Sequence, residues 1–340
     1  MTKKNLLIVN KIPKIFLNKN TLNLLNKKYS YIIRKITNDL DTPNQTLSVL
    51  SKKFKLNFSL KDLNNFRKFE NLVIIGMGGS ILGTEAIYDF LKHKVKKNVQ
   101  FIDNIDSKKI YSIKRKFVFK KTLYIVTSKS GNTIETFSNF LSLNIIKKNS
   151  NNIIIISEKK NNLLYGLAKK FKLFHISHKS YIGGRYSVLS EVGMVPAYLM
   201  GLNILKLRSN LKNHLDKKEK LLLKDSAIKL SNLLYNKKVT NLIFLNYIPQ
   251  LEKFLFWCQQ LIAESLGKNG YGFLPVISNT PKDHHSLLQL YLDGPMDKLF
   301  YVFSIKEMAK KKINTRKISE KASFLNNKTL IKIKDAQKTL

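Results

Sequence analysis

The chain has 340 residues, 44% of them hydrophobic, a composition typical of a folded protein with room for two domains. Its formal net charge of +39 does not indicate a nucleic-acid partner, because only 6 of the 61 basic residues are arginine and the abundance of lysine, asparagine and isoleucine throughout indicates coding bias. The single cysteine, Cys258, excludes an internal disulfide, and no apolar run reaches the ~18 residues of a membrane span, so we expect a cytoplasmic protein with no membrane or nucleic-acid partner.

From residue 72 onward the sequence repeats one pattern, a short apolar run followed by a turn and a longer amphipathic segment. The apolar runs predict strands at 72–75, 99–102, 123–126, 153–156 and 173–176. The amphipathic segments predict helices near 81–93, 107–116, 132–147 and 160–170, and a further helix at 190–206. Successive strand–helix units predict a parallel sheet covered by helices on both faces.

A second block of the same kind follows a boundary near residue 207. The sequence predicts helices at 218–236, 249–266 and 284–292, and extended segments at 241–245, 273–277 and 299–303. We therefore expect an N-terminal extension at 1–45, a first domain at 46–206 and a second domain at 207–340. The lysine-rich end of the chain, from Lys306, shows no terminal helix, so the second domain is expected to be shortened.

The turn "GMGGSILG" follows the first predicted strand directly. It is no dinucleotide fingerprint, because Ile81 occupies the place of the third glycine, and no lysine followed by serine or threonine closes it as a P-loop. Gly79 and Ser80 stand where a helix begins, and the free amide groups there favour an anion or a sugar hydroxyl. The alternative is that the glycines only permit a tight turn.

The segment "SKSGNT" follows the third predicted strand and begins another helix. Ser128, Ser130 and Thr133 supply three hydroxyls, and Lys129 supplies an ammonium group among open backbone amides. Such a set predicts a phosphate site. Helix capping is the alternative, but it explains one hydroxyl and not three with a lysine.

Two further charged residues are candidates for chemistry. Arg185 follows Gly183 and Gly184 in "YIGGRYSVLSEVG", and the glycines let the backbone approach a ligand; a surface-loop arginine is the alternative. Glu264 lies in the last helical turn of "QQLIAESLGKNG", where the helix dipole disfavours a carboxylate. It is a candidate general base, and a solvated helix glutamate is the alternative.

The histidines do not predict a metal site. His284 and His285 are neighbours and point about 100° apart on a helix, which argues against shared coordination. His175 and His178 lie where a strand meets a loop, with no third ligand in sight, and are interpreted as structural.

Together, the motifs "GMGGSILG", "SKSGNT", "GGRYSVLSEVG", "ESLGKNG" and "DHHSLLQLYLDG" resemble, in this order, the glucose-6-phosphate isomerase family of the sugar isomerase (SIS) superfamily. The resemblance runs through residues 72–300. It implies an α/β protein with two SIS-type doubly wound parallel-sheet domains (αβα sandwiches), the second lacking its C-terminal helices. It also implies a homodimer and the isomerisation of glucose 6-phosphate to fructose 6-phosphate in glycolysis and gluconeogenesis.

The roles of individual residues come from this resemblance alone. The residues matching those that hold the sugar and its phosphate are Gly79, Ser80, Ser128, Lys129, Ser130 and Thr133. Gly184 and Arg185 match the pair beside the reacting carbons, and Glu264 matches the catalytic base. His285 matches the histidine that assists ring opening from the neighbouring subunit. The implied reaction passes through a cis-enediolate and requires no metal or organic cofactor.

The sequence departs from the family at its C-terminal end. The family has a further catalytic lysine in a late Gly-Lys, and no counterpart follows residue 305. We expect that the chain is shortened. Two alternatives stay open: a non-catalytic SIS protein that binds phosphosugars, and a phosphosugar isomerase of broader specificity.

Overall fold

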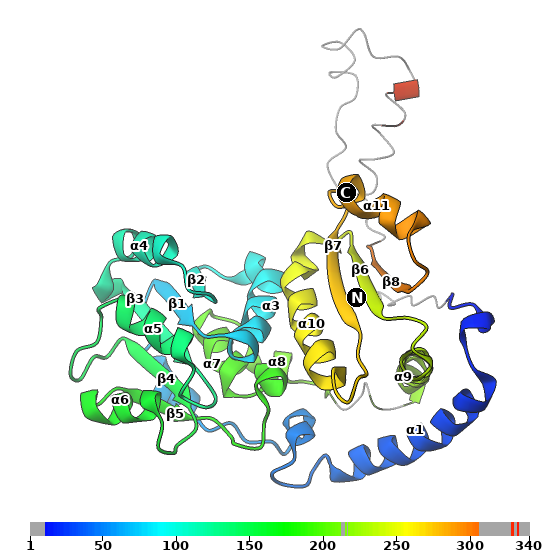
Figure 1. Cartoon of the computed structure of the whole chain (residues 1–340). Coiled ribbons are helices and arrows are strands. Elements are labelled where there is room, and N and C mark those ends of the chain that lie inside the picture. Colours follow the sequence, from blue (N-terminus) through cyan, green and yellow to red (C-terminus); the bar gives the residue numbers. More distant parts are fainter. Residues whose placement is uncertain (1–10, 212–214, 216, 306–327, 330–331, 333–340) are drawn as a thin grey trace.

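The protein contains two parallel β-sheets, each flanked by helices (Figure 1). A computed structural model describes residues 11–211, 215, 217–305, 328–329 and 332. The strand order is β2-β1-β3-β4-β5 in the first sheet and β7-β6-β8 in the second, and every pairing is parallel. The predicted α/β class with two parallel sheets is confirmed.

The first sheet comes from the five predicted apolar runs. Its strands are β1 (Asn71–Ile75), β2 (Asn98–Ile102), β3 (Thr122–Thr127), β4 (Ile153–Ser157) and β5 (Phe174–Ser177). The helices around it are α2 (Leu60–Asn64), α3 (Leu82–Leu91), α4 (Ser107–Lys116), α5 (Ile134–Ser142), α6 (Leu163–Phe171), α7 (Glu191–Leu199) and α8 (Ile204–Leu207). Short 3-10 turns are η2 (Thr46–Leu50), η3 (Gly78–Ser80), η4 (Lys92–Lys94), η5 (Phe119–Lys121) and η6 (Gly184–Leu189).

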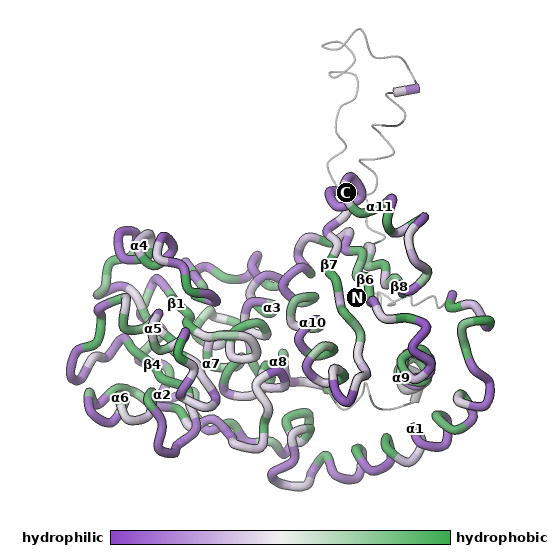
Figure 2. Tube along the Cα trace, in the orientation of Figure 1, coloured by the Kyte–Doolittle hydropathy of each residue, from purple (hydrophilic) through white to green (hydrophobic). Residues whose placement is uncertain are grey.

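The central strands are apolar throughout because the sheet is buried on both faces. Along β1, Leu72 and Ile74 belong to one apolar cluster, whereas Val73 and Ile75 belong to another. All residues of β1, β3 and β4 are buried. Figure 2 shows these strands as apolar segments, whereas polar and apolar residues alternate along helices such as α4 and α6.

Two predicted helices are shorter in the structure. The helix expected at 190–206 breaks after α7, because Gly201 has a φ of 89°, and α8 begins anew behind Asn203, whose side chain accepts a hydrogen bond from the Lys206 amide. The helix expected at 132–147 ends with α5 at Ser142, near Asn144, whose φ is also positive. In both places the predicted helix ends early because one residue, Gly201 or Asn144, adopts a positive φ.

The second sheet is smaller and also follows the predicted order. Its strands are β6 (Asn241–Asn246), β7 (Leu274–Asn279) and β8 (Lys298–Phe303), and its helices are α9 (Lys217–Asn236), α10 (Glu252–Leu266), which follows the turn η8 (Pro249–Leu251), and α11 (His284–Asp293). The N-terminal extension forms η1 (Lys14–Phe16) and α1 (Lys19–Asp39), and α1 lies against α9. Asn18 and Asn232 exchange two hydrogen bonds there, of 3.0 and 2.9 Å.

The second sheet is much less buried than the first. No residue of β8 or α11 is buried. The large apolar side chains of Leu274, Leu292 and Val302 are exposed. Most of the chain after β8, including the region in which we expected no closing helix, lies outside the described residues.

The two sheets meet through α3 and α10, which lie side by side (Figure 1). Across this contact the Lys253 ammonium lies 3.5 Å from the buried Glu85 carboxylate. Burial raises the pKa of Glu85, and Lys253 opposes that effect. The contact therefore carries a charged pair as well as apolar packing.

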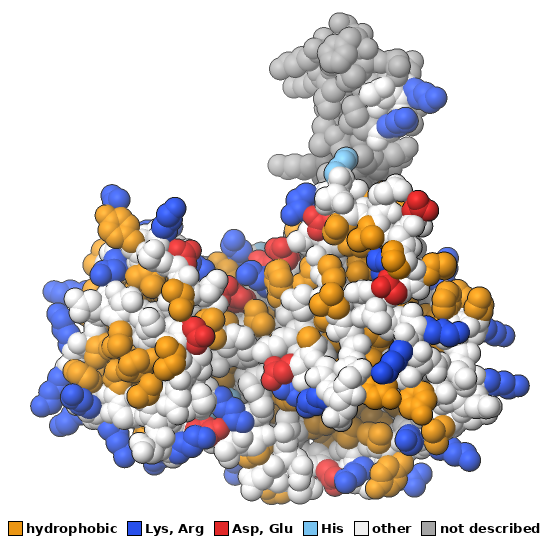
Figure 3. Space-filling view, viewed as in Figure 1, with side chains coloured by type: hydrophobic (Ala, Val, Ile, Leu, Met, Phe, Trp, Pro, Cys, Tyr) orange, Lys and Arg blue, Asp and Glu red, His pale blue; other side chains and the backbone are white. Residues whose placement is uncertain are grey.

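Basic side chains are distributed widely over one face of the molecule. On the face shown in Figure 3, Lys and Arg side chains are scattered over both lobes and alternate with polar and apolar ones. A nucleic-acid site usually gathers them along one continuous stripe. This face carries no such stripe.

Candidate active site

The candidate site lies at the carboxyl ends of β1 and β3, where ligands of parallel sheets usually bind. These strands are neighbours, so the turns that follow them lie side by side. A Cβ atom at Gly76, in the first turn, would lie 3.1 Å from the Thr127 carbonyl oxygen at the end of β3. The structure therefore brings the first two sequence motifs together.

The turn after β3 holds three hydroxyls close to one another. The Ser128 oxygen lies 2.9 Å from the Thr133 hydroxyl and 3.4 Å from the Ser130 hydroxyl. The Gly131 amide donates to the Ser128 oxygen over 3.2 Å, and Gly131 has a φ of 69°. We call residues 128–133 the hydroxyl loop. Its Lys129 side chain is partly buried and lies 3.8 Å from the Glu158 carboxylate.

The glycine turn after β1 packs against the arginine turn. Gly79 in η3 touches the backbone of η6 so closely that a Cβ there would lie 2.3 Å from the Gly184 carbonyl carbon. The Ser187 hydroxyl binds both sides, since it donates to the carbonyl oxygens of Gly79 and Gly184 at 3.2 and 2.6 Å. Gly79 is thus needed for this close packing, whereas a Cβ at Gly184 would come no nearer than 3.8 Å to Gly79. Ser80 is the next residue of η3.

Arg185 lies in η6 and Glu264 in α10, and the two form an ion pair. An Arg185 guanidinium nitrogen (Nη1) donates to Glu264 Oε1 over 2.7 Å, and Arg185 Nε donates to the Ser265 hydroxyl over 2.9 Å. The Glu264 side chain keeps 53% of its surface exposed, whereas Arg185 keeps 16%. A carboxylate and a guanidinium are thus in direct contact, and the carboxylate is open to solvent. In such a pair the carboxylate can move a proton and the guanidinium can stabilise a negative charge.

The structure adds residues that the sequence motifs did not single out. Gln260, one helical turn before Glu264, donates to its second carboxylate oxygen over 3.1 Å. It also lies against Gly78 of η3, which places it between the glycine turn and Glu264. The spacing of four residues on one helix was the available signal. Trp257 on the same helix donates to the Arg185 carbonyl oxygen over 2.9 Å.

Two more side chains on this surface have shifted acidities. Burial raises the pKa of the Tyr186 hydroxyl, but hydrogen bonds with Ser265 and Arg185 and the Arg185 charge outweigh it, so the pKa lies below its ordinary value. The Tyr186 and Ser265 hydroxyls are 2.9 Å apart. Burial raises the pKa of the Cys258 thiol to about 11, so this cysteine stays protonated and is a poor nucleophile.

The structure does not bring His285 to Glu264 within one chain. Gln259 of α10 contacts Pro275 at the start of β7, whereas α11 follows the end of β7. The C-terminal part of α10, which holds Glu264, and the start of α11, which holds His285, therefore lie toward opposite ends of that strand (Figure 1). His284 is held by a 3.2 Å hydrogen bond with the Tyr247 hydroxyl. The His285 side chain is exposed and has no hydrogen bond or ion pair within the described part of the chain.

The remaining histidines occupy structural positions. The His175 ring is hydrogen-bonded to the Ser157 hydroxyl, and His178 is buried. Among the described residues, no group of three or more histidine, cysteine, aspartate or glutamate side chains could hold a metal ion. Within the same residues, no helix is both long and apolar enough to cross a membrane.

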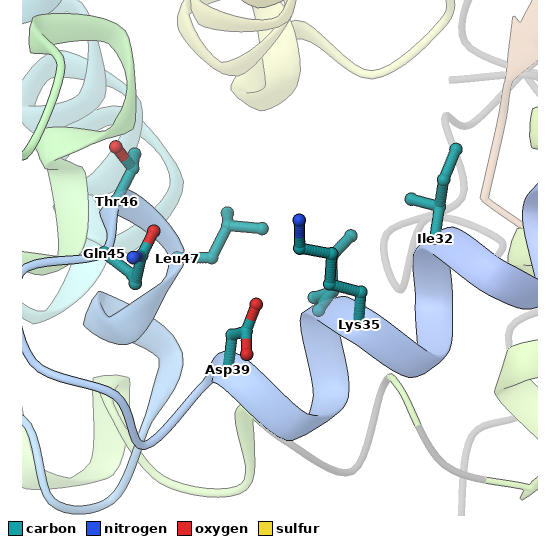
Figure 4. A pocket seen from close by; sticks show the side chains of 7 residues that line it. Ile32, Lys35, Asp39, Gln45, Thr46 and Leu47 are labelled. Carbon is teal, nitrogen blue, oxygen red and sulfur yellow. The ribbon is translucent and has the colours of Figure 1, made fainter.

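A surface hollow lies elsewhere, between α1 and η2 (Figure 4). Side chains that line it include Ile32, Lys35 and Asp39 of α1 and Leu47 of η2. No site residue predicted from the sequence lines this hollow. The convergence of charged and hydroxyl groups around η3 therefore marks the candidate site.

The fold is shared with two solved structures. A hypothetical protein from Thermus thermophilus matches with a TM-score of 0.68 and 22% identity, covering 96% of this chain and 84% of that one. A glucose-6-phosphate isomerase from Chlamydia trachomatis matches with a TM-score of 0.63 and 17% identity, covering 95% and 72%. The protein thus has the SIS-type αβα architecture that the sequence motifs implied.

Sequence comparison defines the family within this class. The family model described as phosphoglucose isomerase matches residues 51–271. A probable glucose-6-phosphate isomerase of Methanococcus maripaludis is 38% identical over 252 residues, which are 70% of this chain and 57% of that protein. The glucose-6-phosphate isomerase of Methanocaldococcus jannaschii is 37% identical over 272 residues, which are 76% and 67%. The chain belongs to the phosphoglucose isomerase family, and its matches span roughly 57 to 67% of these two relatives.

Proposed function

We propose that the protein interconverts glucose 6-phosphate and fructose 6-phosphate. The observation that carries this proposal is the convergence of Arg185 and Glu264, at 2.7 Å, beside the glycine turn that adjoins the hydroxyl loop. The relatives named glucose-6-phosphate isomerase support the substrate. This reaction would place the protein in glycolysis and gluconeogenesis.

The phosphate end of the substrate binds at the hydroxyl loop in this proposal. Ser128, Ser130 and Thr133 offer hydroxyls, with Ser128 within 3.4 Å of each of the other two, and Lys129 adds a positive charge. Ser80 and Gly79 of the neighbouring turn contact the sugar. Binding at this remote end fixes the orientation of the reacting carbons, which is where most of the advantage of a preorganised site arises.

The reacting end of the sugar lies between Glu264 and Arg185. After ring opening, Glu264 removes the proton from C2 and returns it to C1, while the hydroxyl proton of O2 passes to O1. The two transfers convert an aldose into a ketose through a cis-enediolate. Arg185, assisted by its neighbour Gly184, stabilises the negative charge on the enediolate oxygens. Glu264 has both oxygens engaged by Arg185 and Gln260 in the free protein, so substrate must compete with the Arg185 contact.

Ring opening is assigned to His285 of a second copy of the chain. Its exposed side chain, without a partner among the described residues, is available to a neighbouring molecule, whereas His284 is fixed by Tyr247. We infer a homodimer in which each active site receives His285 from the other subunit. A cytoplasmic location fits the substrate.

The test compares the wild-type chain with Glu264→Gln in the conversion of glucose 6-phosphate to fructose 6-phosphate. Loss of a general base lowers kcat by roughly 10² to 10⁴. Glu70→Gln is the matched control, because it makes the same change in charge in an exposed ion pair with Lys121, at the amino ends of β1 and β3 and thus opposite the candidate site. Control activity should equal that of the wild type.

Two results would point elsewhere. Wild-type turnover by Glu264→Gln would exclude this residue as the base. Binding of glucose 6-phosphate without turnover by the wild-type chain would favour the non-catalytic phosphosugar-binding alternative. Comparable turnover of mannose 6-phosphate would indicate a broader isomerase.

A further inference from the structure

We propose that Glu158 is a positioning residue, which holds the Lys129 ammonium beside the hydroxyl loop so that it meets the substrate phosphate. The proposal rests on the function proposed above and assigns a role to a residue outside the motifs. Glu158 directly follows β4, the strand next to β3. Its backbone amide donates to the Lys129 carbonyl oxygen over 3.0 Å.

The Glu158 carboxylate bridges two lysines. Its Oε1 atom lies 3.8 Å from Lys129 Nζ, and its Oε2 atom lies 2.5 Å from Lys160 Nζ. The glutamate side chain keeps 9% of its surface exposed, whereas Lys129 keeps 30% and Lys160 keeps 56%. A carboxylate this buried is costly unless it is paired, and its two ammonium partners supply that pairing.

The position of this carboxylate requires an explanation. A negative charge near an anion site repels the ligand, so electrostatics alone would favour a neutral residue at 158. A free lysine side chain samples many rotamers, and ordering it when phosphate arrives reduces affinity. An anchor that orders Lys129 beforehand removes part of this loss. The long distance of 3.8 Å leaves the ammonium free to turn toward a phosphate oxygen.

Asn162 fixes the backbone from which Glu158 acts. Its Nδ2 group donates to the Glu158 carbonyl oxygen over 2.9 Å, and its Oδ1 atom accepts from the Tyr165 amide at the start of α6. The same Oδ1 atom lies where a Cβ of Gly131 would be, 1.8 Å away. The 158–163 segment therefore packs directly against the hydroxyl loop, and the spacing between Glu158 and Lys129 is set by the backbone.

The first experiment measures binding by calorimetry, with glucose 6-phosphate and inorganic phosphate as the two probes. Glu158→Gln should raise Kd for both about tenfold, as expected when a contact between charged groups is lost. In the turnover assay KM should rise while kcat stays within about twofold. Glu158→Asp, which retains the charge, should recover part of the affinity, and Glu70→Gln should match the wild type in both assays.

A double-mutant cycle with Lys129→Gln tests whether Glu158 acts through Lys129. If it does, adding Glu158→Gln to Lys129→Gln leaves Kd unchanged. Tighter phosphate binding by Glu158→Gln, or additive losses in the double mutant, would overturn the proposal. If Glu158→Gln does not fold, Glu158→Asp replaces it in the cycle. An equal loss of affinity when Glu158→Asp is added to the wild type and to Lys129→Gln, or no loss in either, would then overturn the proposal.

The binding measurements separate this proposal from the enzymatic one. A wild-type chain that binds both probes without converting glucose 6-phosphate contradicts the isomerase assignment, yet the effect of Glu158 on Kd still decides its role. Conversely, an active enzyme whose Kd for phosphate is insensitive to Glu158→Gln contradicts only the positioning role.

Discussion

His178 is a buried histidine close to the proposed phosphate site. Its Nδ1 atom lies 2.8 Å from the Lys179 carbonyl oxygen, and its Nε2 atom has no hydrogen-bond partner in the described part of the protein. Burial lowers the pKa of His178 to about 4, and the charges of Lys129 and Lys179 act in the same direction. The folded protein therefore holds this ring neutral at physiological pH.

This shift predicts a pH dependence of stability. The unfolded chain protonates His178 below about pH 6.5, whereas the folded chain does so near pH 4, so stability falls as pH decreases through this range. Between pH 7.5 and pH 5 the contribution amounts to about 2 kcal/mol. Urea unfolding should be measured for the wild type and His178→Asn at both pH values. The free energy of unfolding that is lost on going from pH 7.5 to pH 5 should be smaller by about 2 kcal/mol in the variant.

The comparison has an internal control. His93 is exposed, so His93→Asn should retain the pH dependence of the wild type. An equal loss of stability on acidification in wild type and His178→Asn would contradict the inferred neutral state of the buried ring.

At the scale of elements, the contact between η3 and η6 depends on the absence of a side chain. A Cβ at Gly79 would lie 2.3 Å from the Gly184 carbonyl carbon and 2.4 Å from the Arg185 amide nitrogen. Both are backbone atoms, so Gly79→Ala must displace one turn and with it Arg185. We expect a loss of about 1–3 kcal/mol in stability, typical of overpacking, and a large fall in kcat/KM.

Gly166 provides the matched control for this substitution. It lies within α6, and a Cβ there would meet nothing within 4 Å. Gly166→Ala should therefore raise stability by up to about 1 kcal/mol and leave activity unchanged. Thermal unfolding and turnover assays of the two variants test the contact; a Gly79→Ala protein with wild-type stability would refute it.

The same elements show what the sequence could predict. Continuous apolar runs such as Ile153–Ser157 identify strands of a sheet buried on both faces, and hydroxyl and glycine motifs after them mark the strand ends. The sequence did not predict the end of α7, which is followed by Gly201 with its positive φ. The partners Ser265, Gln260 and Glu158 were not identified, because their contacts to the motif residues depend on tertiary packing. The role of His285 stays a prediction.

At the scale of the whole molecule, the two sheets differ in burial and should differ in local stability. β3 and β4 are fully buried, whereas no residue of β8 is buried. Backbone amides exchange through local opening, which is easier where few apolar contacts hold a segment. Hydrogen–deuterium exchange of the intact chain should be slowest in the first sheet and fastest in β8 and α11.

The central strand of the second sheet refines this prediction. Leu242, Ile243 and Phe244 of β6 are buried, so β6 should exchange more slowly than β8 although both belong to the same sheet. Equal protection of β3 and β8 would show that the exposed apolar surface of the second sheet is covered in solution.

The ion pair between Arg185 of η6 and Glu264 of α10 joins the two halves of the chain. In the proposed function neither half alone holds both the base and the guanidinium, so the rate of turnover depends on how the two halves are positioned against each other. Glu85 and Lys253 lie within that joint and are assigned no contact with substrate. Substitutions there can alter turnover by shifting the base relative to the guanidinium, and compensating changes are then expected on the opposite helix, α3 or α10.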